Sequence, residues 1–339
     1  MYASKPGASQ KRGRIVSSLQ MRILIIKPSS LGDVVHGLPT VNLIRRKYPQ
    51  AHISWLINDT LASLLRHSPI IDELILFERQ RFGSLMQLPE FGRFLGALGR
   101  GQFDVAVDLQ GLLRSGIMTW ATRARRRIGL SDAREGARCF YNEIVSVPRT
   151  HAVDRYLLAA RHLGCDALPV EFPLGVSESI APEGLIAVSP SARWATKLWG
   201  GDKFAELIRR LPPERVVLTG SAVEREFIDQ IAQGRRNLAG QTDLFQLAEL
   251  YRRCRVVITN DSGPMHLAAA VGTPVVAIFG PTDPALTGPY GSQHVVLRAG
   301  IPCSPCFKDY CTNRVPMECM KLIRVEQVLE AASRLCSNV

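Results

Sequence analysis

Short apolar runs rich in β-branched residues alternate with helix-like segments along most of the chain. The predicted strands cover residues 22–27, 52–57, 73–77, 103–109, 185–189, 216–219, 237–239, 256–259, 275–278 and 295–297. The predicted helices cover residues 34–48, 61–66, 112 onward, 152–163, 203–210, 224–232, 244–253 and 325–335. Regular alternation of strands and helices predicts an α/β fold built on doubly wound parallel sheets.

One segment interrupts this alternation and divides the chain. Residues 167–184 contain three prolines and two glycines and show little periodicity, which is typical of a linker. We therefore predict two Rossmann-like domains, at residues 21–175 and 176–339, that face a central cleft. Residues 1–20 carry four basic and no acidic residues and have no apolar stretch, so we predict a disordered basic tail there.

Composition narrows the class of protein. A length of 339 residues fits two domains, and no apolar run approaches the ~18 residues that a membrane span requires. The formal net charge of +12 favours an acidic partner, which would be a nucleic acid, an anionic membrane surface or a phosphorylated substrate. A nucleic-acid-binding protein is suggested by the charge alone, because the sequence shows no helix-turn-helix, zinc-finger spacing or aromatic-studded basic strand.

The most informative stretch runs from residue 256 to residue 280 and is predicted to form strand, turn, helix and strand. In its turn, Asp261 or Ser262 suits the N-cap, Gly263 permits close approach of a ligand, and Pro264 fits the first helical turn. The helix would present free N–H groups at the carboxyl edge of the sheet, where a phosphate binds well. An ordinary capped turn explains the same residues equally well.

Asp33 is the candidate base. It follows the first strand in a polar turn, so its carboxylate could accept a proton from a hydroxyl nucleophile, and burial against an apolar wall would raise its basicity. An N-cap aspartate is the alternative interpretation. Because no GxGxxG follows this strand, the sequence does not predict a dinucleotide cofactor.

Three further residues in the second half are candidate ligands of a nucleotide. Lys197, in the segment 189–199 that also carries Ser191, could pair with a diphosphate across from the turn at Ser262. Glu224 could accept hydrogen bonds from ribose hydroxyls, although a helix-starting glutamate is equally plausible. His266 lies one turn into the helix and could face the same anion, whereas a lone histidine beside an apolar helix is more often structural.

The cysteines are unevenly distributed. Four of the eight follow the pattern Cys303-x2-Cys306-x4-Cys311-x7-Cys319, which is dense enough to consider a structural zinc or iron–sulfur site despite its irregular spacing. The other four are scattered and are predicted to be small core residues.

Five ordered motifs together resemble a known family. They are KPSSLGD (27–33), DLQGLLRS (108–115), HAVDR (151–155), PSARWATKLW (190–199) and NDSGPMHLAAAVGTPVVAIFGPTDP (260–284). This set resembles the lipopolysaccharide heptosyltransferases of glycosyltransferase family 9, and most of all the heptosyltransferase I branch. The likeness covers nearly everything from Met21 onward and implies a GT-B fold, with the acceptor on the first domain and the nucleotide sugar on the second.

The resemblance implies a reaction and residue roles. Heptose would pass from ADP-heptose to the Kdo of lipid A with inversion and without a catalytic metal or cofactor, so that any metal at the cysteines would be structural. Asp33 would be the base, with Ser30 beside it. The resemblance implies that the nucleotide sugar is bound by the following residues: Ser30, Ser191, Lys197, Glu224, Asp261, Ser262, Gly263 and His266. Of these, Lys197 and the turn at Ser262 would hold the diphosphate and Asp261 the heptose.

The acceptor implied by the resemblance is phosphorylated and lies at the cytoplasmic face of the inner membrane. A basic segment that includes Arg114, Arg123 and Arg138 would contact it, although a solvated arginine-rich face explains any single arginine as well. We therefore expect a cytoplasmic protein that associates peripherally with this membrane and does not bind nucleic acid. Two enzymatic alternatives stay open: a heptosyltransferase II-like enzyme with another sugar or acceptor, and a GT-B sugar-nucleotide epimerase.

Overall fold

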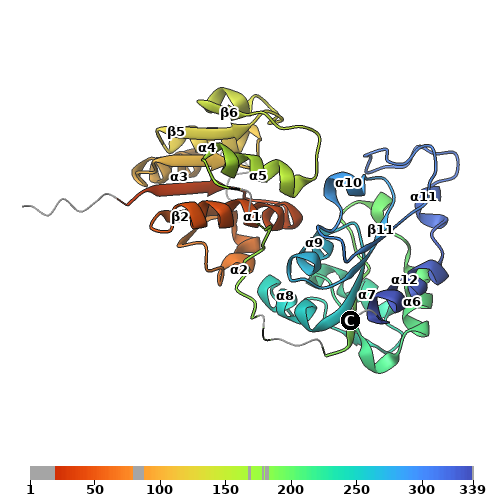
Figure 1. Cartoon of the computed structure of the whole chain (residues 1–339). Coiled ribbons are helices and arrows are strands. Elements are labelled where there is room, and N and C mark those ends of the chain that lie inside the picture. The colour runs from red at the N-terminus through yellow and green to blue at the C-terminus, as the bar shows by residue number, and fades with distance from the viewer. Residues whose placement is uncertain (1–19, 79–87, 167–168, 178, 180–182, 338–339) are drawn as a thin grey trace, which may run out of the picture.

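Two parallel six-stranded sheets, each flanked by helices, form the two halves of the molecule (Figure 1). The structure is a computed structural model and describes residues 20–78, 88–166, 169–177, 179 and 183–337. Apart from Gln20, the predicted tail at 1–20 lies outside the described residues. The first sheet contains β1 (Arg22–Ile26), β2 (His52–Asn58), β3 (Glu73–Phe77), β4 (Val105–Asp108), β5 (Arg126–Leu130) and β6 (Glu143–Val145). The second contains β7 (Leu185–Ser189), β8 (Val216–Leu218), β9 (Arg236–Asn237), β10 (Cys254–Asn260), β11 (Val275–Phe279) and β12 (Val295–Arg298).

Most of the helices connect successive strands, and the last two follow the final strand β12. In the first half they are α1 (Leu31–Lys47), α2 (Ala62–Leu65), α3 (Leu88–Arg100), α4 (Leu113–Ala121) and α5 (Ala152–His162). In the second half they are α6 (Gly201–Arg210), α7 (Arg225–Ile231), α8 (Leu244–Arg253), α9 (Gly263–Ala270), α10 (Pro284–Thr287), α11 (Glu318–Lys321) and α12 (Val325–Ser337). The central strands β1, β10 and β11 are almost completely buried, which is why they read as unbroken apolar runs in the sequence.

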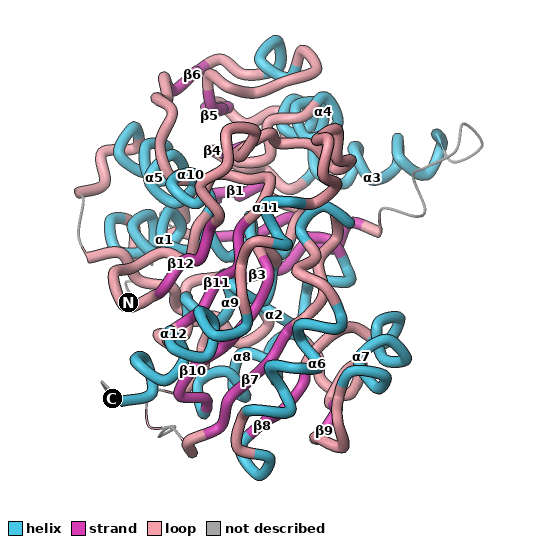
Figure 2. The backbone as a smooth tube through the Cα atoms, turned by 90° about the vertical axis from the view of Figure 1, so that its right-hand side faces the viewer, coloured by secondary structure: helices cyan, strands magenta, loops and turns pink. Residues whose placement is uncertain are grey.

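Both sheets have the same strand order. The first runs β3-β2-β1-β4-β5-β6, and the second runs β12-β11-β10-β7-β8-β9, which is the same winding repeated with six new strands (Figure 2). In each sheet the winding reverses direction between two central strands, β1 and β4 in the first and β7 and β10 in the second. Loops at such a reversal leave a crevice at the carboxyl edge of the sheet. The predicted doubly wound fold is confirmed.

The two halves pack directly against each other through α1 and α9. One apolar core continues from β1 and α1 of the first half into α8, α9 and β10 of the second. The contact is close because two glycines face it: a Cβ on Gly263 would lie 2.7 Å from the Leu31 side chain, and a Cβ on Gly32 would lie 2.9 Å from Nε2 of His266. A hydrogen bond between the rings of His36 and His266 and one from the Tyr290 hydroxyl to Asp154 also join the halves.

Strands β5 and β6 do not appear among the sequence predictions, and in β5 the reason is its two arginines. Arg126 opens β5, yet its guanidinium donates two hydrogen bonds of 2.7 Å to the Glu143 carboxylate on the adjacent β6. Arg127 donates to the Phe140 carbonyl. Because neighbouring groups satisfy both side chains, a run that reads as a solvated basic segment forms a strand with a buried carboxyl end. Helix α3 is also absent from the predictions, since three glycines weaken its helical pattern.

No helix in the described part of the chain is long and apolar enough to span a bilayer.

We expect the substitution Gly32→Ala to weaken the contact between the halves. The new methyl group would force the buried His266 ring aside, at a cost of about 1–3 kcal/mol in the free energy of unfolding. Urea denaturation would measure this loss. Gly92→Ala in α3 is the matched control: nothing lies within 4 Å of its Cβ position, so better helix propensity should leave stability equal or slightly higher. Equal stability of Gly32→Ala and the parent would contradict the close contact.

Candidate active site

Asp33 lies in the first turn of α1, directly after the central strand β1. Its Oδ2 accepts hydrogen bonds from the backbone N–H and the hydroxyl of Ser30, at 3.1 and 2.8 Å. Its Oδ1 accepts a 3.2 Å hydrogen bond from the Tyr156 hydroxyl and lies 3.7 Å from the Lys27 ammonium. Asp33 thus closes a capping box with Ser30, which agrees with the structural interpretation of this residue, and at the same time presents a fixed carboxylate at the crevice.

The electrostatic surroundings of Asp33 correct one expectation. Burial acts to raise the pKa of its carboxyl group, but the Lys27 ammonium and the hydrogen bonds from Ser30 outweigh burial and hold the pKa below its ordinary value. The prediction that burial would raise the basicity of Asp33 is therefore wrong. Lys27 stays protonated, because Tyr156 and Asp33 raise the pKa of its ammonium group more than burial lowers it. Asp33 is consequently an ionised carboxylate at neutral pH.

On the second half, Lys197 and Asp261 form an ion pair. Lys197 comes from a short 3₁₀ turn after β7, and Asp261 directly follows β10, so the winding brings them together at the point where it reverses. Their Nζ and Oδ2 atoms lie 2.6 Å apart, and the Thr282 hydroxyl donates to the same oxygen. The ammonium also lies 4.9 Å from the centre of the Trp194 ring. The Lys197 ammonium and the Asp261 carboxylate are thus both fixed in position next to each other.

The N-terminus of α9 adjoins this ion pair. Ser262 is the N-cap, and Pro264 occupies the first turn, as predicted. The Ser191 hydroxyl is buried, and among the described residues it has no hydrogen-bond partner, so a ligand could satisfy it. Because Leu31 packs on Gly263 and His266 lies over Gly32, the turn that carries Asp33 and the turn that carries Ser262 are in direct contact. The two halves therefore present one composite site.

Three histidines lie behind these turns. Nε2 of His36 and Nδ1 of His266 are 2.9 Å apart, and the ring centre of His151 is 5.5 Å from that of His36. Nε2 of His151 donates to the Gly288 carbonyl, because its Nδ1 accepts from the backbone N–H of Val153. Burial lowers the pKa of His266 to about 4 and lowers those of His36 and His151 as well, so all three are neutral at pH 7.

Glu224 makes the contacts of a helix start. Its Oε2 accepts from the backbone N–H and the hydroxyl of Ser221, at 2.7 and 2.8 Å. This capping box follows β8 at the carboxyl edge of the second sheet, so Glu224 lies on the same edge as Lys197 but is engaged locally.

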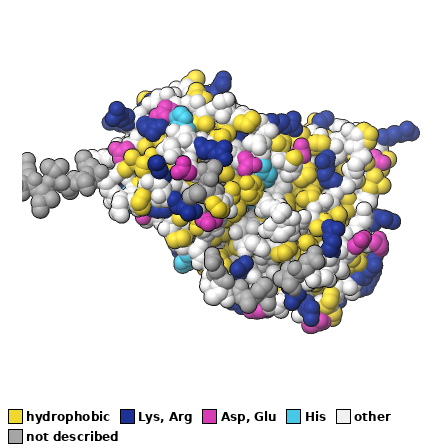
Figure 3. Space-filling model, viewed as in Figure 1, with side chains coloured by type: hydrophobic (Ala, Val, Ile, Leu, Met, Phe, Trp, Pro, Cys, Tyr) yellow, Lys and Arg dark blue, Asp and Glu magenta, His cyan; other side chains and the backbone are white. Residues whose placement is uncertain are grey.

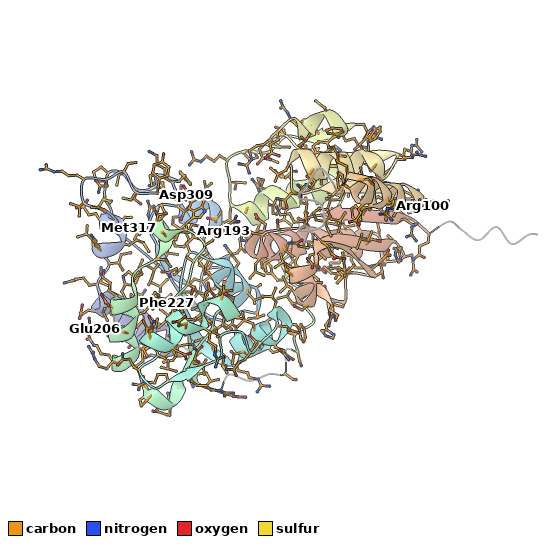
Figure 4. The ribbon with its side chains drawn as sticks, turned by 180° about the vertical axis from the view of Figure 1, so that it is seen from behind. Arg100, Arg193, Glu206, Phe227, Asp309 and Met317 are labelled. Atoms are coloured by element: carbon orange, nitrogen blue, oxygen red, sulfur yellow. The ribbon has the colours of Figure 1, made fainter. Side chains whose placement is uncertain are left out.

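The structure separates the three arginines expected to bind an acceptor. Arg114 is exposed on the first turn of α4 and lines a cavity of about 390 Å³ with Ser29, Asn58, Gln110 and Glu135. Arg138 is also exposed, in the segment that follows β5. Arg123, however, follows the end of α4 and shares a cavity with Arg100, which Figure 4 places at the side of the first half remote from the second. Basic side chains elsewhere are spread over both halves (Figure 3).

The four clustered cysteines line one small cavity of about 180 Å³. Within the described ranges, no three histidine, cysteine or acidic side chains converge closely enough to hold a metal ion, so the structure does not support the metal site considered from their spacing. The segment instead forms hydrogen bonds with two neighbouring loops. The Lys308 carbonyl accepts from the Thr196 hydroxyl, and the Ser304 hydroxyl donates to the Gly280 carbonyl. Asp309 and Met317, on the same segment, mark its position in Figure 4.

The model of glycosyltransferase family 9 (heptosyltransferase) matches residues 91–315. Lipopolysaccharide heptosyltransferase 1 of Pseudomonas aeruginosa is 32% identical over 330 residues, covering 91% of this chain and 92% of its own. The chain belongs to glycosyltransferase family 9. Among solved structures, Escherichia coli ADP-heptose lipopolysaccharide heptosyltransferase II gives a TM-score of 0.77 at 27% identity, covering 94% of this chain and 99% of its own. Escherichia coli heptosyltransferase WaaC with ADP-2-deoxy-2-fluoro heptose gives 0.77 at 26% identity, covering 93% and 99%.

These similarities confirm the predicted family, the enzyme class and the GT-B arrangement of this glycosyltransferase. Sequence reasoning nevertheless missed several of the groups that shape the site. Lys27 is the last residue of a predicted buried strand. Because a buried cation needs a partner of opposite charge, a lysine at that position indicates a nearby carboxylate. Tyr156 and Thr282 gave no such signal, since each reaches the site from a distant segment.

The neutral histidines predict a pH dependence of stability for this family 9 enzyme. The pKa of His266 is lower in the folded state than the 6.5 of a free histidine, so the unfolded state binds the extra proton and stability is lost as pH falls from about 6.5 to about 4. The full loss from this group is roughly 3 kcal/mol. We expect the unfolding free energy of His266→Gln to depend less on pH over this range. An exposed histidine outside the cluster provides the control, His67→Gln, and an unchanged slope in His266→Gln would contradict the prediction.

Proposed function

We propose that this enzyme transfers L-glycero-D-manno-heptose from ADP-heptose to the Kdo of lipid A and inverts the anomeric configuration. The observation that carries the proposal is the contact between the turn of Asp33 and the turn of Ser262, which puts a carboxylate beside an anion-binding helix terminus. The donor is supported by the family and by the solved relative bound to ADP-2-deoxy-2-fluoro heptose. The acceptor is supported by the 32% identity to a lipopolysaccharide heptosyltransferase 1.

Asp33 acts as the general base in this mechanism. Its carboxylate accepts the proton of the acceptor hydroxyl while the hydroxyl oxygen attacks the anomeric carbon from the face opposite the diphosphate. The hydroxyl–proton bond breaks, the new glycosidic bond forms, and the bond to ADP breaks with its electron pair leaving on the diphosphate. Because Lys27 and Ser30 make Asp33 a weak base, we infer that the proton moves late, when the attacking oxygen has already become acidic. Tyr156 keeps the carboxylate oriented.

Positive groups of the second half stabilise the leaving diphosphate. Lys197 and the positive end of the α9 helix dipole, with the backbone N–H of Gly263, supply fixed positive charge where the negative charge develops, without a catalytic metal. The Ser191 hydroxyl donates to the same group, Asp261 accepts from the heptose hydroxyls and Glu224 from the ribose. These contacts compete with pairings in the structure, in which the Lys197 ammonium is paired with Asp261 and the Glu224 carboxylate accepts from Ser221.

The acceptor binds the first half in this proposal. The cavity beside Asn58, Gln110 and Arg114 opens at the carboxyl edge of the first sheet, next to the turn of Asp33. Arg114, at this cavity, and Arg138, after β5, contact the phosphates of lipid A, while Arg123 lies beyond the C-terminal end of α4 and is too distant to join them. We also infer that residues 21–175 form the acceptor domain, that residues 176–339 form the donor domain, and that the enzyme works at the cytoplasmic face of the inner membrane as a peripheral protein.

The substitution Asp33→Asn tests the base. We expect acceptor-dependent ADP release from ADP-heptose to fall about 10²–10⁴-fold, because the amide cannot accept the proton, while the Kd for ADP changes little. The assay uses purified protein with de-acylated Kdo-lipid A. Asp202→Asn is the matched control, since Asp202 is also a first-turn carboxylate but lies exposed on α6. Turnover by Asp33→Asn within twofold of the parent would rule out this base.

The same assay distinguishes the alternatives. A heptosyltransferase II-like enzyme, to which a solved relative at 27% identity points, would release ADP only with a different sugar donor or with an acceptor other than de-acylated Kdo-lipid A. An epimerase would process the nucleotide sugar without any acceptor. If ADP-heptose neither binds nor turns over, the donor assignment fails, and a salt-sensitive complex with arbitrary DNA would then favour the nucleic-acid interpretation of the charge.

A further inference from the structure

We infer that His36 is a positioning residue that fixes the tautomer of His266, so that His266 presents an N–H group to the diphosphate of the nucleotide sugar. The inference deepens the proposed function and rests on it for the identity of the ligand. His36 belongs to α1 of the first half and His266 to α9 of the second, so the proposed hydrogen bond also couples the helix of the base to the helix of the donor.

The hydrogen bond between the two rings requires one donor and one acceptor. Nε2 of His36 and Nδ1 of His266 are 2.9 Å apart, and the planes of the two neutral rings meet at 80°. Either His36 carries its proton on Nε2 and donates, or His266 carries its proton on Nδ1 and donates. In the first arrangement Nδ1 of His36 is unprotonated, and in the second it carries a proton. The surroundings of this atom therefore decide between the two arrangements.

The far side of the His36 ring favours the first arrangement. Its Nδ1 is enclosed, and it has no hydrogen-bond partner in the described part of the chain. A proton on Nδ1 would therefore be a buried donor without an acceptor, whereas an unpaired buried acceptor costs less than an unpaired buried donor. We conclude that His36 carries its proton on Nε2 and donates to Nδ1 of His266.

The tautomer of His266 follows directly. Its Nδ1 accepts, so its proton is on Nε2. That atom lies over Gly32 in the turn that precedes Asp33, and no described residue forms a hydrogen bond with it. An Nε2–H at this place is a neutral donor that a diphosphate beside Lys197 could accept from.

Two substitutions at His36 separate this role from simple packing. His36→Gln keeps an N–H donor near the position of Nε2, and His36→Leu fills similar space without one. We expect His36→Leu to weaken ADP binding roughly 10-fold, raise the KM for ADP-heptose by a similar factor and leave the KM for the acceptor unchanged. We expect His36→Gln to bind ADP within about threefold of the parent. A residue that only fills space would give the opposite order or no difference.

A spectroscopic readout makes the test independent of turnover. Long-range ¹H–¹⁵N NMR of the histidine-labelled full chain reports which ring nitrogen of His266 is protonated. We expect Nε2–H in the parent and in His36→Gln, and a mixture of tautomers in His36→Leu. Protonation of His266 on Nδ1 in the parent, or parent-like ADP affinity of a folded His36→Leu, would overturn the inference.

Failure of the proposed function would look different. If the parent binds neither ADP nor ADP-heptose, the ligand assignment is wrong, and the NMR measurement alone then decides whether His36 sets the tautomer of His266. If His36→Leu does not fold, as judged by circular dichroism, the spectrum of the parent and the ADP affinity of His36→Gln decide it.

Discussion

The close packing of the first turn of α1 on the first turn of α9 is the constraint on which the site depends. It brings together two helix starts from different sheets, and it requires Gly32 and Gly263 because a Cβ at either position would collide with the opposite helix. Each turn follows a central strand at the point where the winding of its sheet reverses. Because both sheets have the same strand order, each sheet has one crevice at its carboxyl edge. The contact between the two helix starts places these crevices next to each other, so they form one site.

The fold was largely predictable because its central strands obey simple rules. Buried parallel strands read as apolar runs, and β3, β7 and α8 have the bounds that the pattern predicted. The hydrophobic pattern did not predict a strand where charged residues occupy partly buried positions. Arg126 belongs to a strand only because Glu143 on the next strand binds it, and no local rule in the sequence reveals that partner.

The site was predictable in its residues and less so in its energetics. Motif spacing identified Asp33, Lys197 and the turn at Ser262, but the predicted direction of the Asp33 pKa shift was wrong, because Lys27 and the hydrogen bonds from Ser30 outweigh burial. Tyr156, which also donates to this carboxylate, lies more than a hundred residues further along the chain. In the same way, the separation of Arg123 from Arg114 follows from the length of α4, which carries the chain from one edge of the sheet to the other.

Two ion pairs in the site indicate how the donor would bind there. Lys27 pairs with Asp33, and Lys197 pairs with Asp261, so each half of the molecule neutralises its own buried charge. A diphosphate competes with Asp261 for Lys197, and the carboxylate then keeps only the Thr282 hydroxyl and gains capacity to accept from sugar hydroxyls. Lys27 has no such competitor, because its ammonium is enclosed beneath Asp33 and Tyr156. In the proposed reaction, therefore, the pair on the donor side rearranges with the substrate while the pair on the base side stays fixed, and the base keeps its orientation through binding and transfer.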